Sequence, residues 1–174
     1  TDSYYNPTFE LIGDIAASLD LLKGNLGTYQ HKGEYEQKIK AELDQKLFTE
    51  GFSDQHYPLR PRKIVSVCRK ILGKEDILCL DNGIYKLWFS RHYKTYHIGT
   101  FILDNTLATM GAGLPSAMAA KLVNPDKKVV AVCGDGGFLM NVQELETAKR
   151  LGNPFVIIIF NDNKYGMIEW KQHN

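Results

Sequence analysis

The chain has 174 residues, of which 44% are hydrophobic and 24% are charged, a composition typical of a soluble globular protein with a core of normal size. Its formal net charge of +1 creates no field that would recruit nucleic acid or an anionic membrane, and its lysines and arginines are scattered among acidic residues. We therefore expect neither nucleic acid nor a membrane as a partner.

The sequence also lacks signals for export or for a disulfide or metal framework. No signal peptide is visible, and no apolar run approaches the roughly 18 residues that a membrane-spanning helix needs, so the expected location is cytoplasmic. Cys68, Cys79 and Cys133 do not have the spacing of metal ligands. Two of them lie in apolar, strand-like runs, and all three are predicted to be core residues.

The first part of the chain favours helices and connectors. Apolar residues at helical spacing predict a helix over 9–22, which the glycines of 24–27 would end. A second helix, rich in charge and with a narrow apolar stripe, is predicted over 35–49 and interpreted as a solvated linker helix. Glycine and proline indicate a connector over 51–62, after which helical spacing resumes over 63–72.

The second part alternates short apolar strands with helices. Helices are predicted over 116–123, where Pro115 suits the first turn, and over 144–151. Strands are predicted over 76–81, 101–103, 130–133 and 155–160. A strand, helix, strand unit implies a parallel sheet flanked by helices, so the predicted fold class is α/β, preceded by an N-terminal helical linker segment.

A glycine-rich corner follows the third predicted strand, where Gly134, Asp135, Gly136 and Gly137 come in succession. Open α/β sheets bind ligands at the carboxyl ends of their strands, and a helix N-terminus there offers free N–H groups to an anion. The glycines leave room for a phosphate, but Asp135 would repel a diphosphate unless a divalent cation lay between them. Magnesium prefers carboxylate, phosphate and water oxygens, and Asp162 follows the next strand as a second ligand.

A Gly-Asp-Gly sequence followed by a strand-terminal Asn/Asp pair resembles the cofactor motif of thiamine-diphosphate enzymes. From about Leu59 onward the chain is similar to the C-terminal, diphosphate-binding domain of the acetolactate synthase (acetohydroxyacid synthase) group, in its catabolic branch. The similarity is carried by five blocks in the same order: Asp81–Gly83 with Trp88, Thr109–Pro115, Gly134–Phe138, Glu144–Ala148 and Asn161–Met167. It implies the thiamine-diphosphate-binding fold, with thiamine diphosphate and Mg²⁺ as cofactors.

The resemblance also implies a role for individual residues. The backbone carbonyl of Ala108 would accept a hydrogen bond from the 4′-amino group of the cofactor, and Met110 would wedge between its two rings. Such a wedge activates the cofactor by holding the 4′-imino nitrogen near the proton that it removes. A role for Met110 as core filler stays open as the alternative.

The remaining site residues follow from the same resemblance. The metal ligands would be Asp135, Asp162 and the backbone carbonyl of Lys164. Ile84 and Tyr85 stand where many relatives have a polar residue and a histidine. The residues expected to contact the cofactor are Gly83, Ile84, Tyr85, Ala108, Met110, Gly134, Asp135, Gly136, Gly137, Asp162, Tyr165, Gly166 and Met167.

The domain organisation is likewise implied by resemblance. Residues 1–24 would be the tail of a preceding central domain, residues 25–57 a linker with a helix, and residues 58–174 a thiamine-diphosphate domain that is incomplete at its C-terminus. The chain starts at Thr1 without an initiator methionine and stops soon after a predicted metal ligand. We therefore expect a fragment that is truncated at both ends.

The function implied for the full-length protein is that of an acetolactate synthase, a transferase that condenses two pyruvates to 2-acetolactate with release of CO₂. It would be a homodimer or homotetramer with the active site shared between subunits, and its activating glutamate would come from outside this chain. The isolated fragment is therefore expected to be inactive. The alternatives are another thiamine-diphosphate decarboxylase or carboligase of 2-keto acids, or a non-catalytic cofactor-binding or assembly domain.

A dinucleotide-binding unit has a similar outline, with Asp162 hydrogen-bonded to a ribose. Leu139, however, stands where the third glycine of that pattern belongs, and Asp135 would face a pyrophosphate without compensation. A phosphate-binding loop of the nucleotide-hydrolase kind is excluded, because no Gly-Lys-Ser/Thr follows the corner.

Overall fold

The computed structural model describes residue 4 and residues 7–27, 33–49, 51 and 53–173 of the chain. The chain divides into two compact units, Thr1–Ile39 and Lys40–Asn174, and each is described by itself. The domain boundaries expected near residues 24 and 57 stay predictions. Within the described ranges, no helix combines the length and the apolar character that a passage through a bilayer requires.

The first unit contains α1 (Ile15–Asn25) and most of α2 (Glu34–Leu43). α1 starts at Ile15 because Asp14 is its N-cap: the Asp14 carboxylate accepts a hydrogen bond from the N–H of Ala17 at 2.9 Å. The helix predicted over 9–22 is therefore shifted to 15–25, since apolar spacing alone does not mark the cap. No side chain of α1 is buried.

α2 continues into a short π-helix, η1 (Asp44–Thr49), in the second unit. The helix predicted over 35–49 is confirmed in its extent, with a wider last turn, and α2 buries no side chain. Two contacts tie η1 to the residues around α4 (Lys86–His92): His92 Nδ1 lies 2.9 Å from the carbonyl of Leu47, and Lys94 Nζ lies 3.0 Å from Asp44 Oδ1.

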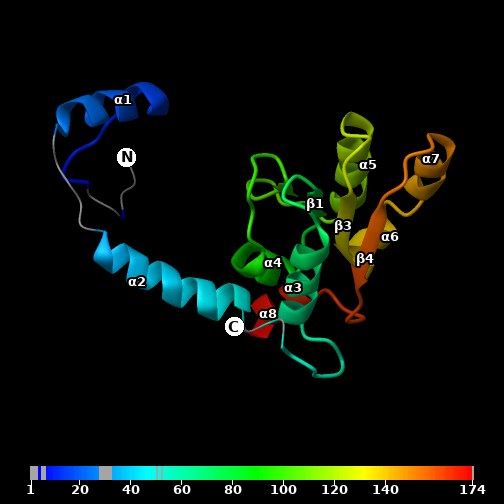
Figure 1. Cartoon of the computed structure of the whole chain (residues 1–174). Helices are drawn as coiled ribbons and strands as arrows, with labels where there is room; N and C mark the ends of the chain where they lie inside the picture. The colour runs from blue at the N-terminus through cyan, green and yellow to red at the C-terminus, as the bar shows by residue number, and fades with distance from the viewer. Residues whose placement is uncertain (1–3, 5–6, 28–32, 50, 52, 174) are drawn as a thin grey trace. The chain divides into compact units, whose positions relative to one another are not determined.

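Four parallel strands form a sheet in the second unit: β1 (Ile77–Leu80), β2 (Phe101–Leu103), β3 (Val129–Gly134) and β4 (Val156–Phe160). Each is an apolar run, and β3 and β4 are rich in β-branched residues that favour extended backbone. The order is β2-β1-β3-β4, and Gly134 pairs with Phe160. The chain passes from β1 outward to β2 and returns across β1 to β3, so the winding reverses between β1 and β3. Figure 1 shows β3 between β1 and β4. The predicted parallel α/β sheet is confirmed.

Helices cover both faces of this sheet, because successive strand residues point to opposite sides. On one face, α3 (Pro61–Ile71) and α4 pack over Leu78, Leu80, Val130 and Val132. On the other face, α5 (Gly113–Val123) packs over Ile77, Cys79, Val129, Ala131 and Cys133. All three cysteines are buried and free, as predicted for core residues.

Three further helices follow the corner: α6 (Asp135–Met140), α7 (Glu144–Arg150) and α8 (Gly166–His173). α7 confirms the helix predicted over 144–151. The helices predicted from Lys63 and Ser116 begin earlier, at Pro61 in α3 and at Gly113 in α5. α4, α6 and α8 were not predicted from the sequence.

Candidate functional site

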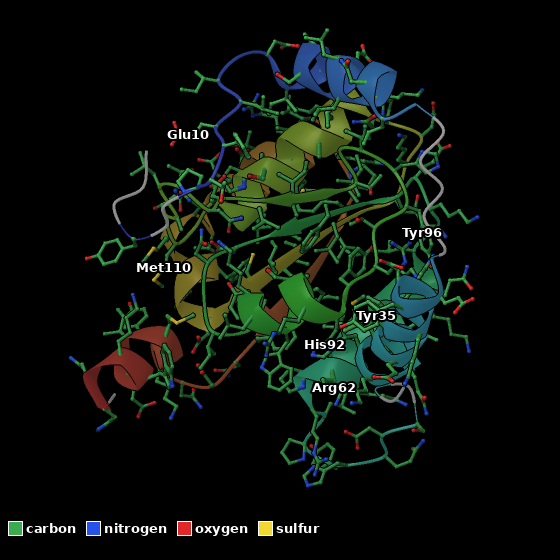
Figure 2. The ribbon with its side chains drawn as sticks, turned by 90° about the vertical axis from the view of Figure 1, so that its left-hand side faces the viewer. Glu10, Tyr35, Arg62, His92, Tyr96 and Met110 are labelled. Atoms are coloured by element: carbon green, nitrogen blue, oxygen red, sulfur yellow. The ribbon has the colours of Figure 1, made fainter. Side chains whose placement is uncertain are left out.

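A cavity of about 730 Å³ lies at the carboxyl ends of the strands, where the winding of the sheet reverses. Segments that follow all four strands line it, together with the beginning of α3 and part of α8. Every residue assigned from the sequence to the cofactor or the metal lines this one cavity: Gly83, Ile84, Tyr85, Ala108, Met110, Gly134, Asp135, Gly136, Gly137, Asp162, Lys164, Tyr165, Gly166 and Met167. Met110 lies well apart from His92 and Tyr96 (Figure 2).

Asp81 anchors the end of β1 at this cavity. Its side chain is fully buried, and its carboxylate accepts hydrogen bonds from the N–H groups of Asn82 at 2.7 Å, Gly111 at 3.1 Å and Ala112 at 3.2 Å. Burial raises the pKa of the Asp81 carboxyl, and the backbone N–H donors oppose this shift because they stabilise the charged form. The carboxylate therefore links β1 to the segment that contains Met110.

Asn82 makes the next link between β1 and the segment after β2. Its side-chain amide donates to the carbonyl of Thr109 at 2.6 Å, and its Oδ1 accepts from Lys86 Nζ at 2.7 Å. Lys86 also donates to the carbonyl of Asp104. Burial lowers the pKa of the Lys86 ammonium, and the nearby Asp104 and Asp81 carboxylates oppose that shift. An ammonium group is therefore held at the wall of the cavity.

The glycines of the corner let other side chains approach. A Cβ on Gly134 would lie 3.0 Å from Tyr85 Cε1, and one on Gly136 would lie 2.6 Å from Tyr165 Cε1 and 3.4 Å from Met110 Cε. A Cβ on Gly137 would lie 2.4 Å from Asp81 Oδ2. Besides leaving room for a phosphate, the three glycines thus allow Tyr85, Tyr165, Met110 and Asp81 to converge on the start of α6.

Asp135 and Asp162 follow neighbouring strands. Gly134 pairs with Phe160, so Asp135 comes one residue and Asp162 two residues beyond a paired position. Adjacent strands lie about 4.8 Å apart, which brings both carboxylates to the same edge of the sheet. Within the described residues no group of three or more His, Cys, Asp and Glu side chains could hold a metal ion. A metal bound by Asp135 and Asp162 must therefore complete its shell with carbonyl, ligand and water oxygens.

The loop after β4 is shaped by its own side chains. Asn161 Oδ1 accepts from the N–H of Asn163 at 3.1 Å, and Asp162 Oδ1 accepts from the N–H of Lys164 at 3.3 Å. Asn163 has a φ of 57°, a left-handed conformation that asparagine tolerates. The Lys164 ammonium pairs with Glu169 at 2.6 Å, which raises its pKa. The side chain of Lys164 is thus engaged with α8, and a metal contact from this residue must come from its backbone.

Tyr85 brings an unsatisfied donor to the cavity. Its ring stacks on Phe160 with centroids 5.3 Å apart, it is 5% exposed, and its Oη has no hydrogen-bond partner in the described part of the chain. Burial raises the pKa of Tyr85, so the hydroxyl stays protonated. Buried hydroxyl groups in native proteins usually have a hydrogen-bond partner. An oxygen of a ligand bound in this cavity is a suitable acceptor for the Tyr85 hydroxyl.

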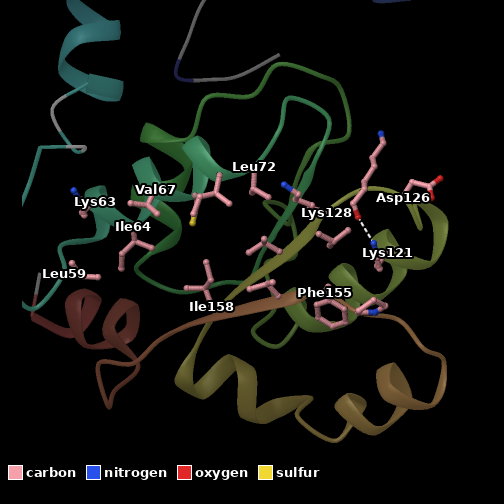
Figure 3. Close-up of a pocket in the computed structure, with 17 residues that line it drawn as sticks. Leu59, Lys63, Ile64, Val67, Leu72, Lys121, Asp126, Lys128, Phe155 and Ile158 are labelled. Atoms are coloured by element: carbon pink, nitrogen blue, oxygen red, sulfur yellow. Dashed lines mark hydrogen bonds between the residues drawn. The ribbon is translucent and has the colours of Figure 1, made fainter.

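A second cavity of about 570 Å³, mostly apolar, lies between α3, the start of β3 and β4 (Figure 3). Ile64, Val67, Leu72 and Ile158 line it, and Lys121 Nζ donates to the carbonyl of Lys127 at 2.7 Å at one side. None of the residues assigned to a cofactor lines this cavity. The candidate site is therefore the cavity at the strand ends.

A sheet that reverses its winding, with a glycine corner and two carboxylates beside one cavity, is typical of proteins that bind a phosphorylated cofactor. The family model of the thiamine pyrophosphate enzyme, C-terminal TPP binding domain, matches residues 81–174. The chain belongs to this family of enzymes, whose cofactor is thiamine diphosphate. Because the chain belongs to this family, the alternative of a dinucleotide-binding unit is set aside.

Relatives agree with this assignment. The chain is 37% identical to an acetolactate synthase of Bacillus subtilis (strain 168), over 98% of its own length and 30% of the relative's. It is 36% identical to a catabolic acetolactate synthase of Raoultella terrigena, over 94% of the chain and 30% of the relative. It is also 41% identical to a putative thiamine pyrophosphate-containing protein of Bacillus subtilis, over 66% of the chain and 20% of that relative. The chain thus spans less than a third of the length of these relatives.

Three polar residues at the site had no role assigned from the sequence. Asp81 and Asn82 were noted as part of a motif block, without a contact for either side chain. Asn141 was not singled out, yet its side-chain amide donates to the carbonyl of Gly111 at 2.7 Å. Contacts across 27 to 31 residues of sequence, such as these, leave no periodic signal in a single sequence.

Proposed function

We propose that the chain is the cofactor-binding part of an acetolactate synthase, a transferase that condenses two pyruvates to 2-acetolactate with release of CO₂. Two relatives that carry the acetolactate synthase name align with nearly the whole chain. The observation that carries the proposal is that one cavity gathers all residues that the family resemblance assigns to the cofactor and the metal.

The side chains at the cavity fit thiamine diphosphate and Mg²⁺. Asp135 and Asp162, with the carbonyl of Lys164, would hold Mg²⁺ and so offset the charge of the diphosphate. Gly134 and Gly136 add no side chain of their own to the corner, where a Cβ would crowd Tyr85 or Tyr165, and the buried hydroxyl of Tyr85 supplies a donor. When bound, thiamine diphosphate supplies a nucleophilic carbon and an electron sink.

The residues of this chain would orient the cofactor rather than transfer its proton. Met110 would fill the angle between the rings, and the backbone carbonyl of Ala108 would accept from the pyrimidine amino group. In the described lining of the cavity, the carboxylates are Asp135 and Asp162, and no glutamate is present. The activating glutamate is thus proposed to come from another part of the full-length protein.

The full-length protein is proposed to be a cytoplasmic homodimer or homotetramer that completes the site between subunits and acts on small 2-keto acids. This chain by itself is proposed to be inactive, because it lacks the activating group. An assay of 2-acetolactate formation from pyruvate, with thiamine diphosphate and Mg²⁺ present, tests this. Formation of 2-acetolactate by the 174-residue chain alone would contradict the proposed division of the site.

Two alternatives share the same cavity. A different thiamine-diphosphate carboligase or decarboxylase is favoured by one relative whose name specifies only that it contains thiamine pyrophosphate. A non-catalytic cofactor-binding module is favoured by the described lining of the cavity, which contains no glutamate. Co-expression with the N-terminal two thirds of a relative, followed by assay with several 2-keto acids, separates these possibilities.

The proposed metal site is tested by replacing Asp135 with asparagine. Calorimetric titration of the chain with thiamine diphosphate should show binding in the presence of Mg²⁺ and little without it. Asp135→Asn should raise the dissociation constant about tenfold or more, because a charged ligand to the bridging metal is lost. Asp126→Asn removes the same charge from an exposed position outside the cavity, and its affinity should match the original chain. Equal affinities of all three chains, or binding independent of Mg²⁺, would refute the proposed site.

A further inference from the structure

The segment that carries Met110 is held by side chains rather than by sheet or helix hydrogen bonds. The carbonyl of Thr109 accepts from Asn82, the N–H of Gly111 donates to Asp81, and the carbonyl of Gly111 accepts from Asn141. The N–H of Ala112 also donates to Asp81. Four backbone groups on the two sides of Met110 therefore depend on three side chains from distant positions in the sequence.

The backbone that these side chains hold has an unusual conformation at Gly111. Gly111 has a φ of +87°, and a Cβ there would lie 2.9 Å from Asn141 Nδ2 and 3.1 Å from Met140 Cβ. The start of α5 is equally close, since a Cβ on Gly113 would lie 2.7 Å from Asp81 Cβ. Glycine at both positions lets β1 and α6 approach the segment closely enough to bond it.

We propose that Asp81, Asn82 and Asn141 are positioning residues that set the place of Met110 in the cavity wall. The inference rests on the proposed function, in which Met110 contacts the cofactor rings. Met110 sits between two peptide groups that are both fixed, so its Cα and side-chain direction are fixed with them. Its Cε lies 3.4 Å from the Cβ position of Gly136, which relates it directly to the corner. A functional group must be held within about 0.5 Å of its productive place, which requires supporting contacts of this kind.

Asn141→Ala is the test, because it removes one supporting bond without substituting any residue that lines the cavity. Asn153→Ala is the matched control. Like the half-buried Asn141, the buried Asn153 donates its amide to a distant backbone carbonyl, that of Met118 at 2.9 Å. Asn153, however, joins α5 to the residues after α7, away from the cavity. Both variants lose one hydrogen bond and should unfold at similarly lowered urea concentrations.

Two ligands separate positioning from general loss of structure. We expect Asn141→Ala to weaken binding of thiamine diphosphate with Mg²⁺ about tenfold, and to leave binding of inorganic pyrophosphate with Mg²⁺ unchanged, because pyrophosphate reaches only the corner. Asn153→Ala should change neither. Equal losses for both ligands, or equal effects of the two variants on thiamine diphosphate, would overturn the proposal.

Amide hydrogen exchange of the ligand-free chain provides a readout that does not need the proposed function. Asn141→Ala should speed exchange of the amides of Gly111 and Ala112, which Asn153→Ala should leave protected. If the original chain fails to bind thiamine diphosphate, the proposed function fails, and faster exchange still supports the role of Asn141 in holding the segment. Unchanged exchange in Asn141→Ala contradicts that role, whatever the chain binds.

Discussion

Tyr85 and Tyr93 are a natural pair for comparison, because each has a buried hydroxyl without a hydrogen-bond partner in the described part of the chain. Tyr85 lines the cavity at the strand ends, whereas Tyr93 packs on Phe101 with ring centroids 5.4 Å apart and lies outside that cavity. A buried hydroxyl without a partner costs about 1–3 kcal/mol of folding free energy. Tyr85 alone is placed to recover this free energy from a ligand.

Replacing either tyrosine with phenylalanine should therefore stabilise the chain, but only the replacement of Tyr85 should weaken ligand binding. Tyr85→Phe should raise the unfolding free energy of the ligand-free chain by about 1 kcal/mol and weaken binding of thiamine diphosphate with Mg²⁺ about fivefold. Tyr93→Phe should stabilise the chain to a similar degree and leave the affinity unchanged. Urea denaturation and calorimetry measure the two quantities. Unaltered affinity in Tyr85→Phe would show that its hydroxyl does not contact the ligand.

At the scale of the element, the first turn of α6 contains two adjacent glycines, Gly136 and Gly137, that face different neighbours. The nearest atom to a Cβ on Gly136 is Cε1 of Tyr165, a side chain that is 53% exposed and free to move outward. The nearest atom to a Cβ on Gly137 is Oδ2 of Asp81, and the buried carboxylate of Asp81 accepts hydrogen bonds from three N–H groups. The same methyl group thus meets a movable neighbour at one position and a fixed one at the next.

Gly136→Ala and Gly137→Ala should consequently have different effects. Gly136→Ala should fold with nearly unchanged stability and lose much of its affinity for thiamine diphosphate, because its methyl group displaces Tyr165 and touches Met110. Gly137→Ala should lose about 2 kcal/mol or more of stability, since overpacking against a fixed carboxylate strains the backbone. Thermal unfolding and calorimetry compare the two chains. Equal losses of stability would mean that the surroundings of Asp81 are as yielding as those of Tyr165.

The elements were predictable from the sequence to the extent that they are long or strongly patterned. β1, β3 and β4 are continuous apolar runs, and α7 has helical periodicity, so each was found. α1 was misplaced because the cap at Asp14 outweighs the apolar spacing that precedes it. The sequence did not predict the break between α6 and α7. At this break Asn141 caps α6, and its side chain donates to the carbonyl of Gly111.

At the scale of the whole molecule, the sequence named residues that prove to line one cavity, but it did not reveal the contacts that support them. The corner at Asp135 and the acid at Asp162 follow from the rule that parallel strands present ligands at one edge, and Met110 follows from resemblance. The roles of Asp81, Asn82 and Asn141 could not be predicted, because they arise where the ends of β1 and α6 meet the segment after β2. Only the folded chain brings those three places together.

The buried thiols and the buried hydroxyl of Tyr93 predict that the chain loses stability at alkaline pH. Burial raises the pKa of Cys68 from 9.0 to about 11, of Cys79 and Cys133 to about 12, and of Tyr93 to about 12. As the pH rises through 9, the unfolded chain releases thiol protons that the folded chain retains. Stability is therefore full below pH 9 and falls above it, by up to about 1.4 kcal/mol per thiol for each pH unit.

Urea denaturation between pH 8 and pH 10 tests this sign. Cys79→Ala should be less stable than the original chain at pH 8, because it leaves a cavity, and should lose stability less steeply toward pH 10, because one buried thiol is gone. Identical slopes for the two chains would exclude Cys79 as a source of the alkaline loss.

β4 has one further consequence for the molecule. It pairs only with β3 among the described strands, and Val156 and Ile159 on it are 59% and 43% exposed. An uncharged, β-branched strand with an open side is a template onto which strands of other molecules can add. Pro154 before the run and Asp162 after it are gatekeepers against such stacking. Asp162, which is proposed as a magnesium ligand, thus also disfavours aggregation through β4 when no cofactor is bound.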